Sequence, residues 1–173
     1  MTANDPADAP RASIPAADGP VIGGVDIRDV AGCACLALRR TGRMATQIYD
    51  AHLQAAGLTI GQFGVMARVY GSSLSGPALT MKELSNVIGL DPTTLNRTLK
   101  PLEAQGLVSI APDARDRRAR CIHLTTSGRE RLAQAMPSWR VADDELRRTL
   151  GAETTLALSG LLGLASEKLR GPA

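Results

Sequence analysis

A set of polar and cationic side chains in the segment 92–106 has the chemistry to contact a nucleic acid. Leu95, Leu99 and Leu102 recur at the spacing of one helix face, so the side chains between them lie on the opposite face. That opposite face carries hydroxyl, amide and cationic groups, which hydrogen-bond phosphate oxygens and the edges of bases. The candidate DNA-binding residues of this helix are Thr93, Thr94, Asn96, Arg97 and Lys100.

The place of each group along this helix indicates its partner. Thr93 and Thr94 lie near the positive end of the helix dipole, which favours phosphate or base contacts. Arg97 can hold a guanine with two hydrogen bonds, and Lys100 suits a phosphate. A solvated polar face on an ordinary surface helix is the alternative interpretation.

A second cationic cluster lies between two short stretches of alternating residues, 108–110 and 122–124. Alternation of this kind is typical of β-strands, so the chain from one stretch to the other is predicted to form a hairpin. A cationic hairpin tip can enter a minor groove, where the negative potential favours arginine. The arginines of this cluster are Arg115, Arg117, Arg118 and Arg120.

The hairpin carries acidic, basic and apolar residues at a distinctive spacing. The run Asp116-Arg117-Arg118 is followed by Ile-His-Leu-Thr at 122–125 and by Gly128. This pattern, D-x-R and then an apolar-x-Leu-Thr strand end, resembles the wing signature of the MarR (multiple antibiotic resistance regulator) family. The segment Leu-Glu-Ala-Gln-Gly-Leu-Val at 102–108 also resembles that family's exit from its recognition helix. The resemblance covers about residues 33–169.

The resemblance implies a winged-helix protein that binds DNA as a dimer. It implies that Arg118 enters the minor groove and that Asp116 braces the wing through an ion pair. It further implies that the first helix and the last two helices pack together to form the dimer.

Capping patterns and apolar spacing predict the elements that position these residues. Thr59 with Gln62, and Thr80 with Glu83, form capping boxes that satisfy backbone N–H groups of a first helical turn. The stretch rich in Gly, Ser and Pro that follows the second helix is predicted to be a loop. The predicted helices span 30–56, 59–70, 80–88, 92–105, 127–150 and 152–169, with the loop at 71–79 and an interruption of the fifth helix near Pro137.

These elements predict a mainly α fold with a small β-hairpin wing, which is a winged helix-turn-helix, and the resemblance implies that its N- and C-terminal helices are dimerisation helices. Residues 1–29, rich in Ala, Pro, Asp and Gly, are predicted to be a disordered tail. Residues 30–173 are predicted to form the winged-helix domain. Within it, 58–126 is the DNA-binding lobe, and 30–57 and 127–169 are the dimerisation helices.

The charge of the chain fits a polyanionic partner. The 173 residues have a formal net charge of +3, but the first 29 contain five Asp and two Arg, so the remainder carries +6. No apolar run approaches the about 18 residues of a membrane span, and a secretory pattern is missing, so a soluble cytoplasmic protein without a membrane partner is expected. Three cysteines without framework spacing predict reduced thiols.

Two of these cysteines, Cys33 and Cys35, form a C-x-C pair in the first helix. A lone pair of this kind is a poor metal motif, so no metal site and no cofactor are predicted. The hydroperoxide-sensing branch of the MarR family has a reactive cysteine at this point, and Cys35 resembles it in its spacing to Tyr49. The sequence departs from that branch at Arg39, where a second tyrosine is expected, although a cation facing Cys35 would favour the thiolate. The alternative is a structural cysteine in a dimer interface.

A small effector is the family's usual alternative to a reactive thiol. The resemblance implies an aromatic or anionic molecule bound between the dimer helices and the DNA-binding lobe. The same residues that could line such a cavity fit a plain hydrophobic core equally well. They are Met44, Ile48, His52, Phe63 and Met66.

Taken together, these features predict a sequence-specific transcriptional regulator, a repressor released by a small-molecule effector, that binds a near-palindromic double-stranded operator as a homodimer. A thiol-based redox or hydroperoxide sensor that uses Cys35 is the alternative function. A winged helix used only for protein contacts would not need the base-reading groups of Asn96, Arg97 and Arg118. No enzyme is predicted, because the sequence shows no nucleophile with its base and no set of metal ligands.

Overall fold

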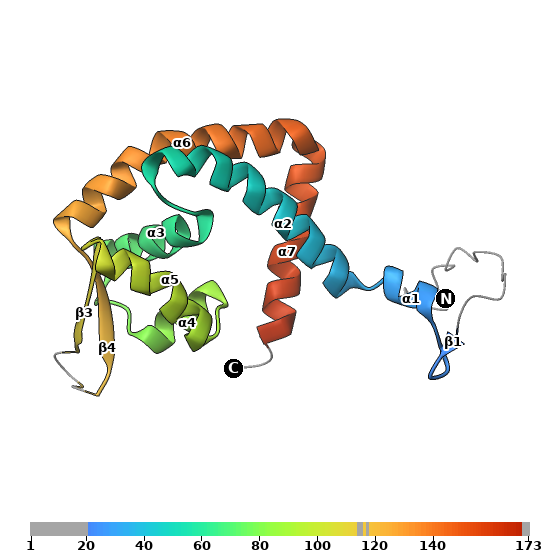
Figure 1. Cartoon of the computed structure of the whole chain (residues 1–173), viewed down its shortest axis with the longest axis horizontal. Helices are drawn as coiled ribbons and strands as arrows, with labels where there is room; N and C mark the ends of the chain where they lie inside the picture. The colour runs from blue at the N-terminus through green and yellow to red at the C-terminus, as the bar shows by residue number, and fades with distance from the viewer. Residues whose placement is uncertain (1–20, 114–115, 117, 171–173) are drawn as a thin grey trace, which may run out of the picture. The chain divides into compact units, whose positions relative to one another are not determined.

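The structure is a computed structural model that describes residues 21–113, 116 and 118–170 (Figure 1). It is mainly helical with a small antiparallel hairpin, which confirms the predicted fold class. Arg115 and Arg117 of the predicted DNA-binding set, and residues 1–20 of the predicted tail, lie outside the described residues. The chain divides into two units, Met1–Gly42 and Arg43–Ala173, which are described in turn.

The described part of the first unit begins with regular structure where a disordered tail was predicted. Strands β1 (Val21–Ile22) and β2 (Val25–Asp26) pair antiparallel, and helix α1 (Ile27–Ala31) follows at once. The carboxylate of Asp26 caps α1 by accepting a hydrogen bond from the Arg28 N–H at 2.8 Å. The prediction of disorder is therefore wrong for residues 21–29, because a local cap and a two-residue turn supply hydrogen bonds that composition alone does not reveal.

The first predicted helix is two helices. Helix α1 ends at Gly32, whose N–H donates to the Asp29 carbonyl at 3.2 Å, and helix α2 (Ala34–Leu53) starts two residues later. Cys33 lies in the break between them. The second helix closes in a short 3₁₀ turn, η1 (Gln54–Ala56), before Gly57 adopts a left-handed conformation at φ 68°. The predicted stop at Gly57 is confirmed, and the predicted continuity from residue 30 is wrong.

In the second unit, the capping residues start the helices where the sequence predicted. Thr59 and Gln62 form a complete capping box at helix α3 (Ile60–Ser75), and Thr80 and Glu83 form another at helix α4 (Met81–Ile88). Helix α5 (Pro92–Ala104) begins behind the cap Asp91. Gly89, with φ 68°, ends α4 and turns the chain into α5, which completes the helix-turn-helix.

The predicted loop at 71–79 is wrong in its first half, because α3 continues to Ser75. The hydroxyls of Ser73 and Ser75 donate to the carbonyls of Tyr70, at 2.7 Å, and Gly71, at 3.4 Å. Serine therefore bonds back to the preceding helical turn here, whereas composition suggested a loop.

The wing is a hairpin of β3 (Val108–Pro112) and β4 (Arg120–Leu124), with Ile110 opposite Ile122 in the register. The strands are two residues longer towards the tip than predicted. The Ile122 N–H also donates to the Leu79 carbonyl at 3.0 Å, so the hairpin is joined to the segment that precedes α4.

Helix α6 (Thr126–Leu150) runs without a break through Pro137, and α7 (Ala152–Arg170) follows. The predicted interruption is wrong. Proline removes one N–H donor, but Leu132 and Ala135 before it and Trp139 after it all belong to the hydrophobic core or pack against it. Packing on both sides holds the helix together across one missing hydrogen bond.

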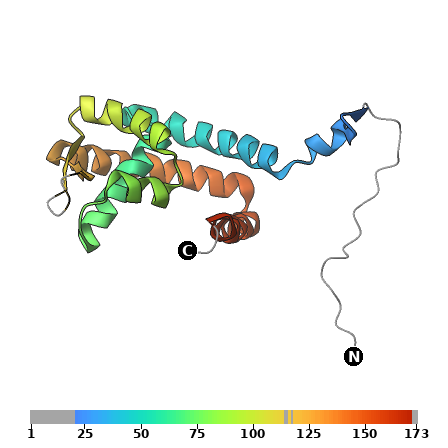
Figure 2. The same cartoon turned by 90° about the horizontal axis from the view of Figure 1, so that it is seen from below.

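The core is mostly aliphatic and joins α3, α4, α5, the hairpin and α6. Phe63 and Trp139 stack within it, with ring centroids 6.0 Å apart. Figures 1 and 2 both show α3 beside the first half of α6, with the hairpin of β3 and β4 next to the start of α6. The largest fully buried side chains of the core are Leu53, Met66, Leu84, Leu95, Leu99, Leu102, Ile122 and Val65. Within the part of the chain that is described, no helix is both long and apolar enough to cross a bilayer.

Candidate nucleic-acid interface

Helix α5 presents two chemically different faces. Leu95, Leu99 and Leu102 are fully buried, which confirms the predicted apolar stripe. The intervening candidate residues are all exposed: Thr93, Thr94, Asn96, Arg97 and Lys100. The helix is thus anchored along one side and offers amide, hydroxyl and cationic groups along the other.

The cap at the start of α5 limits what its two threonines can do. Asp91 accepts hydrogen bonds from the Thr93 N–H at 2.9 Å and the Thr94 N–H at 3.0 Å, and its other oxygen accepts from the Thr94 hydroxyl at 2.5 Å. The hydroxyl bond from Thr94 is the main reason that the pKa of Asp91 is lowered. The Thr94 proton is therefore occupied, and of the two hydroxyls Thr93 is the better placed to donate to a phosphate.

The tip of the wing is held by its own acidic residues. Asp116 accepts a hydrogen bond from the backbone N–H of Arg118 at 2.9 Å, and its carbonyl accepts from Ala119 at 2.9 Å. The backbone N–H of Asp116 in turn donates to Asp113 at 3.2 Å. Arg118 itself is exposed. Asp116 thus constrains the backbone that carries Arg118 through a hydrogen bond to a backbone N–H, whereas the ion pair that the resemblance implied stays a prediction.

Thr125 and Gly128 join the exit of α5 to the start of α6, a role that sequence reasoning did not assign. The Thr125 hydroxyl donates to the Gly106 carbonyl at 2.7 Å and accepts from the Gly128 N–H at 2.9 Å. The Thr125 N–H donates to the Leu107 carbonyl at 3.1 Å. In the sequence, a threonine at a helix start with a glycine three residues later was the signal that could have indicated this role. The hydrogen bonds of Thr125 fix the wing relative to α6.

The cysteines differ in their surroundings. Cys35, in the first turn of α2, is exposed, Cys33 is half-buried, and Arg39 is exposed further along the same helix. Cys121, in β4, is buried, and burial raises the pKa of its thiol to about 11. An exposed thiol is open to oxidants, whereas Cys121 stays protonated near neutral pH.

Tyr49 and His52 connect the later part of α2 to α6. The Tyr49 hydroxyl donates to Asp143 at 2.8 Å, and burial, with this hydrogen bond, raises the pKa of Tyr49 to about 12. His52 lies 2.7 Å from a carboxylate oxygen of Glu145. Because Tyr49 has a single hydroxyl proton, it cannot donate to a thiol while it donates to Asp143.

The five predicted effector-lining residues do not share one environment. Phe63 and Met66 are buried in the core, so their alternative interpretation as core residues is correct. Met44 is 58% exposed, and Ile48 and His52 are half-buried. Only these last three are accessible to a ligand.

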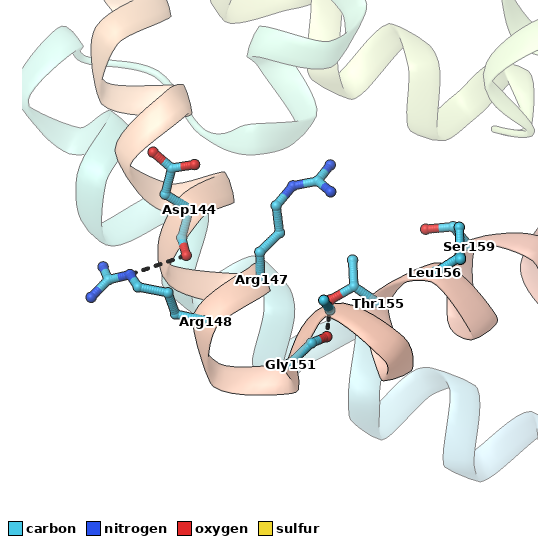
Figure 3. A pocket seen from close by; sticks show the side chains of 8 residues that line it. Asp144, Arg147, Arg148, Gly151, Thr155, Leu156 and Ser159 are labelled. Carbon is cyan, nitrogen blue, oxygen red and sulfur yellow. Dashed lines mark hydrogen bonds between the residues drawn. The ribbon is translucent and has the colours of Figure 1, made fainter.

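A pocket of about 780 Å³ lies between the end of α6 and the start of α7 (Figure 3). Its lining includes Arg147 and Arg148. Figure 3 shows Arg148 folded back towards α6, where its Nε donates to the Asp144 carbonyl at 3.2 Å, while the Thr155 hydroxyl donates to the Gly151 carbonyl at 2.8 Å. Arg147 donates to Asp143 at 2.6 Å. These polar groups are already hydrogen-bonded within α6 or to Gly151 between the two helices.

Comparison with known proteins places this arrangement in a family. A family model described as the MarR family matches residues 56–119, the span of the helix-turn-helix and most of the wing. Among curated proteins, the uncharacterized HTH-type transcriptional regulator YybA of Bacillus subtilis is 28% identical over 96 residues. YwaE of the same organism, described in the same words, is 25% identical over 92 residues. These matches cover 54% and 53% of this chain but only 61% and 54% of the relatives, so the chain spans less than two thirds of the length of either.

Solved structures give a longer match. The transcriptional regulator MosR of M. tuberculosis, in complex with DNA, is 38% identical, has a TM-score of 0.66, and is matched over 80% of this chain and 98% of its own. A mutant of MarR from E. coli, complexed with operator DNA, has a TM-score of 0.69 at 23% identity, over 80% of this chain and 96% of that one, and shows the shared fold. The chain therefore belongs to the MarR family of winged-helix transcriptional regulators.

Proposed function

We propose that the protein binds a specific double-stranded operator and regulates transcription from it. The observation that carries the proposal is that one core holds two exposed basic surfaces. These surfaces are the polar face of α5 and the wing tip with Arg118, which Asp116 braces. The MosR relative, which was crystallised with DNA, supports the same assignment. We propose no catalytic activity for this protein. We propose that it resides in the cytoplasm, with the DNA that it binds.

In this proposal α5 enters the major groove and the wing reaches the adjacent minor groove. Asn96 and Arg97 contact base edges, because amide and guanidinium groups pair with adenine and guanine there. Lys100 and Thr93 contact phosphates and set the register. Arg118 enters the minor groove, where the negative electrostatic potential favours the arginine cation. Arg115 and Arg117, which stand between β3 and β4 in the sequence, are proposed to add to the positive charge of the wing.

The dimeric state is supported by an apolar surface on α7. Large leucine side chains on this helix are exposed in the single chain, which is unusual unless another surface covers them. We propose that α7, with α2 and α6, forms the homodimer, so that two lobes read two half-sites about one helical turn apart in a near-palindromic operator. The exposed leucines are Leu156, Leu161, Leu162, Leu164 and Leu169.

The direct test is a binding assay of the purified protein with the DNA upstream of its own gene. We expect a specific complex that survives excess random DNA, with an affinity that falls steeply as salt rises because phosphate contacts release counterions. A winged helix used only for protein contacts would form no such complex at any salt concentration.

Arg97→Ala is expected to reduce specific affinity by about 1–3 kcal/mol and to relax discrimination at one base pair of each half-site. The reason is that a bidentate contact to one base carries sequence information, while phosphate contacts do not. Binding to the operator and to variants at each position, measured by fluorescence anisotropy, checks this. Arg140→Ala, on the exposed side of α6, is the control and should bind as wild type. An equal loss of affinity for the operator and for random DNA would show that Arg97 contacts only a phosphate.

Repression released by a small aromatic or anionic effector is part of the proposal. Of the predicted lining residues, Met44, Ile48 and His52 remain accessible. Titration of the operator complex with a panel of aromatic carboxylates, for wild type and His52→Ala, tests the effector class and its site.

A thiol-based regulator is the second candidate, and the position of Cys33 favours it. Two residues separated by one position in a helix point to different sides, which would hinder a Cys33–Cys35 bond. Cys33 lies at the N-cap of α2, where its carbonyl accepts the Ala37 N–H at 3.1 Å, and not inside the helix, so this restriction is weaker for it. Hydrogen peroxide would oxidise the Cys35 thiol to a sulfenic acid and be reduced to water. Attack by the Cys33 thiol, or by a small thiol, would then form a disulfide and release a second water.

If Cys35 is a sensor, mild peroxide is expected to release the wild-type protein from its operator, and a reductant should restore binding. Cys35→Ser should stay bound throughout. Mass spectrometry provides an internal control, because the buried Cys121, with its pKa raised by burial, should remain unmodified. Equal binding of the two proteins under all conditions would make Cys35 structural.

A further inference from the structure

Cys121 makes an unusual contact at the base of the wing. Its side chain is 3% exposed, and its thiol donates a hydrogen bond to Asp113 Oδ2 at a distance of 3.1 Å from sulfur to oxygen. Cys121 lies opposite Ala111 in the strand register, and Asp113 directly follows β3. The Asp113 carboxylate therefore reaches back from the start of the wing tip towards the buried face of the hairpin.

Asp113 also organises the tip itself. Its Oδ1 accepts a hydrogen bond from the Asp116 N–H at 3.2 Å, and its own N–H donates to the Ala119 carbonyl at 3.0 Å. Asp116 in turn accepts from the Arg118 N–H at 2.9 Å. A continuous series of hydrogen bonds thus runs from the buried thiol through two carboxylates to the backbone of Arg118.

The other side of Cys121 faces the helix-turn-helix. Cys121 forms an isolated β-bridge with Thr80, the residue that caps α4, and its sulfur lies 3.8 Å from the Ala78 carbonyl. The thiol is therefore held by the body of the lobe, and it ties the wing to the segment that leads into α4. Because burial and the nearby Asp113 raise its pKa to about 11, the thiol keeps the proton that it donates across the physiological range.

We propose that Cys121 and Asp113 are positioning residues for DNA binding, which hold the wing so that Arg118 meets the minor groove in a fixed orientation. The inference rests on the proposed function, since it assumes that the wing contacts DNA. It differs from a packing role in one respect. A hydrophobic residue of similar size could fill the space of Cys121, but it could not donate a hydrogen bond to Asp113. The Asp113 carboxylate would then lose one of the hydrogen bonds that hold it against the hairpin.

The test compares two substitutions of Cys121 that differ in hydrogen bonding. Cys121→Val fills the space and removes the donor, and it should weaken operator binding roughly three- to tenfold, the range expected for one lost hydrogen bond. Cys121→Ser keeps a donor and should bind within about twofold of wild type. Thermal unfolding of both variants shows that the comparison is made on folded protein.

Coupling to the wing distinguishes positioning from general destabilisation. In an Arg118→Ala background, Cys121→Val should have no further effect on affinity, because the residue it positions is gone. The same loss in both backgrounds, or wild-type affinity in Cys121→Val, would overturn the inference. Asp113→Ala, which changes a partly exposed side chain, is expected to repeat the pattern and replaces Cys121→Val if that variant does not fold.

A measurement without DNA separates this inference from the proposed function. Amide hydrogen exchange at Arg118 and Ala119 should be faster in Cys121→Val than in wild type or Cys121→Ser, since their hydrogen bonds depend on the position of the tip. If wild type binds no DNA, the proposed function fails, and so does the role in DNA binding, whatever the exchange rates are. If wild type binds and exchange is unchanged in Cys121→Val, only the bracing role fails.

Discussion

Gly128→Ala is expected to destabilise the protein by more than about 3 kcal/mol, which is a large fraction of the about 5–15 kcal/mol by which folded domains are typically stable. An added Cβ at this position would lie 2.0 Å from the Leu107 carbonyl oxygen, 2.9 Å from its carbonyl carbon and 3.1 Å from Leu124. The obstacle is backbone, and the same carbonyl accepts the N–H of Thr125. Relief of the clash would require α6 to move away from the start of β3. Chemical denaturation and thermal unfolding measure the loss.

The matched control for this variant is Gly64→Ala in α3. No heavy atom lies within 4 Å of an added Cβ there, and the position is in the interior of a helix. Alanine should therefore stabilise the protein by about 0.5–1 kcal/mol through its higher helix propensity. Wild-type stability in Gly128→Ala would contradict the close approach of α6 to Leu107 that the structure shows.

Arg118→Ala is expected to lower operator affinity by about 1–3 kcal/mol, or roughly 5- to 150-fold, while the melting temperature stays within about a degree. The guanidinium group lies on an exposed hairpin tip, so its removal costs little packing. A cation in a narrow minor groove contributes to binding through a potential that neutral alanine cannot exploit. Anisotropy titrations at several salt concentrations, with unfolding curves for both proteins, measure the two effects separately.

Asp116→Ala extends the same experiment. It removes the acceptor of the Arg118 N–H, so we expect a smaller loss of affinity than in Arg118→Ala and no further loss when the two changes are combined. Arg140→Ala on α6 controls for the loss of one positive charge. Wild-type affinity in Arg118→Ala would show that the wing does not contribute to binding.

The sequence by itself determined the features that depend on neighbours in the chain. The capping residues Thr59, Thr80 and Asp91 start α3, α4 and α5 at the predicted places. A capping bond joins groups two or three residues apart, so the local sequence contains both partners. The division of α5 into a leucine face and a polar face followed from helical spacing for the same reason.

Local reasoning failed where distant packing outweighs a local preference. Pro137 lies inside α6 because the core holds the helix on both sides of it. Glycine and serine at 71–75 continue α3, although their composition is typical of a loop. In each case a weak local signal was overruled by contacts that the chain makes only after folding.

The candidate functional residues also divide into features that the sequence determined and features that only the fold decided. The sequence supplied the chemical groups, among them Arg97 and Arg118, since residue type and spacing are enough to recognise them. Only the tertiary structure paired Tyr49 with Asp143, which is 94 residues away, and placed Phe63 in the core. Likewise only the folded hairpin brings the thiol of Cys121 within 3.1 Å of Asp113. Hydrogen bonds act over about 3 Å in space, so partners that are far apart in the chain are found only after the fold has brought them together.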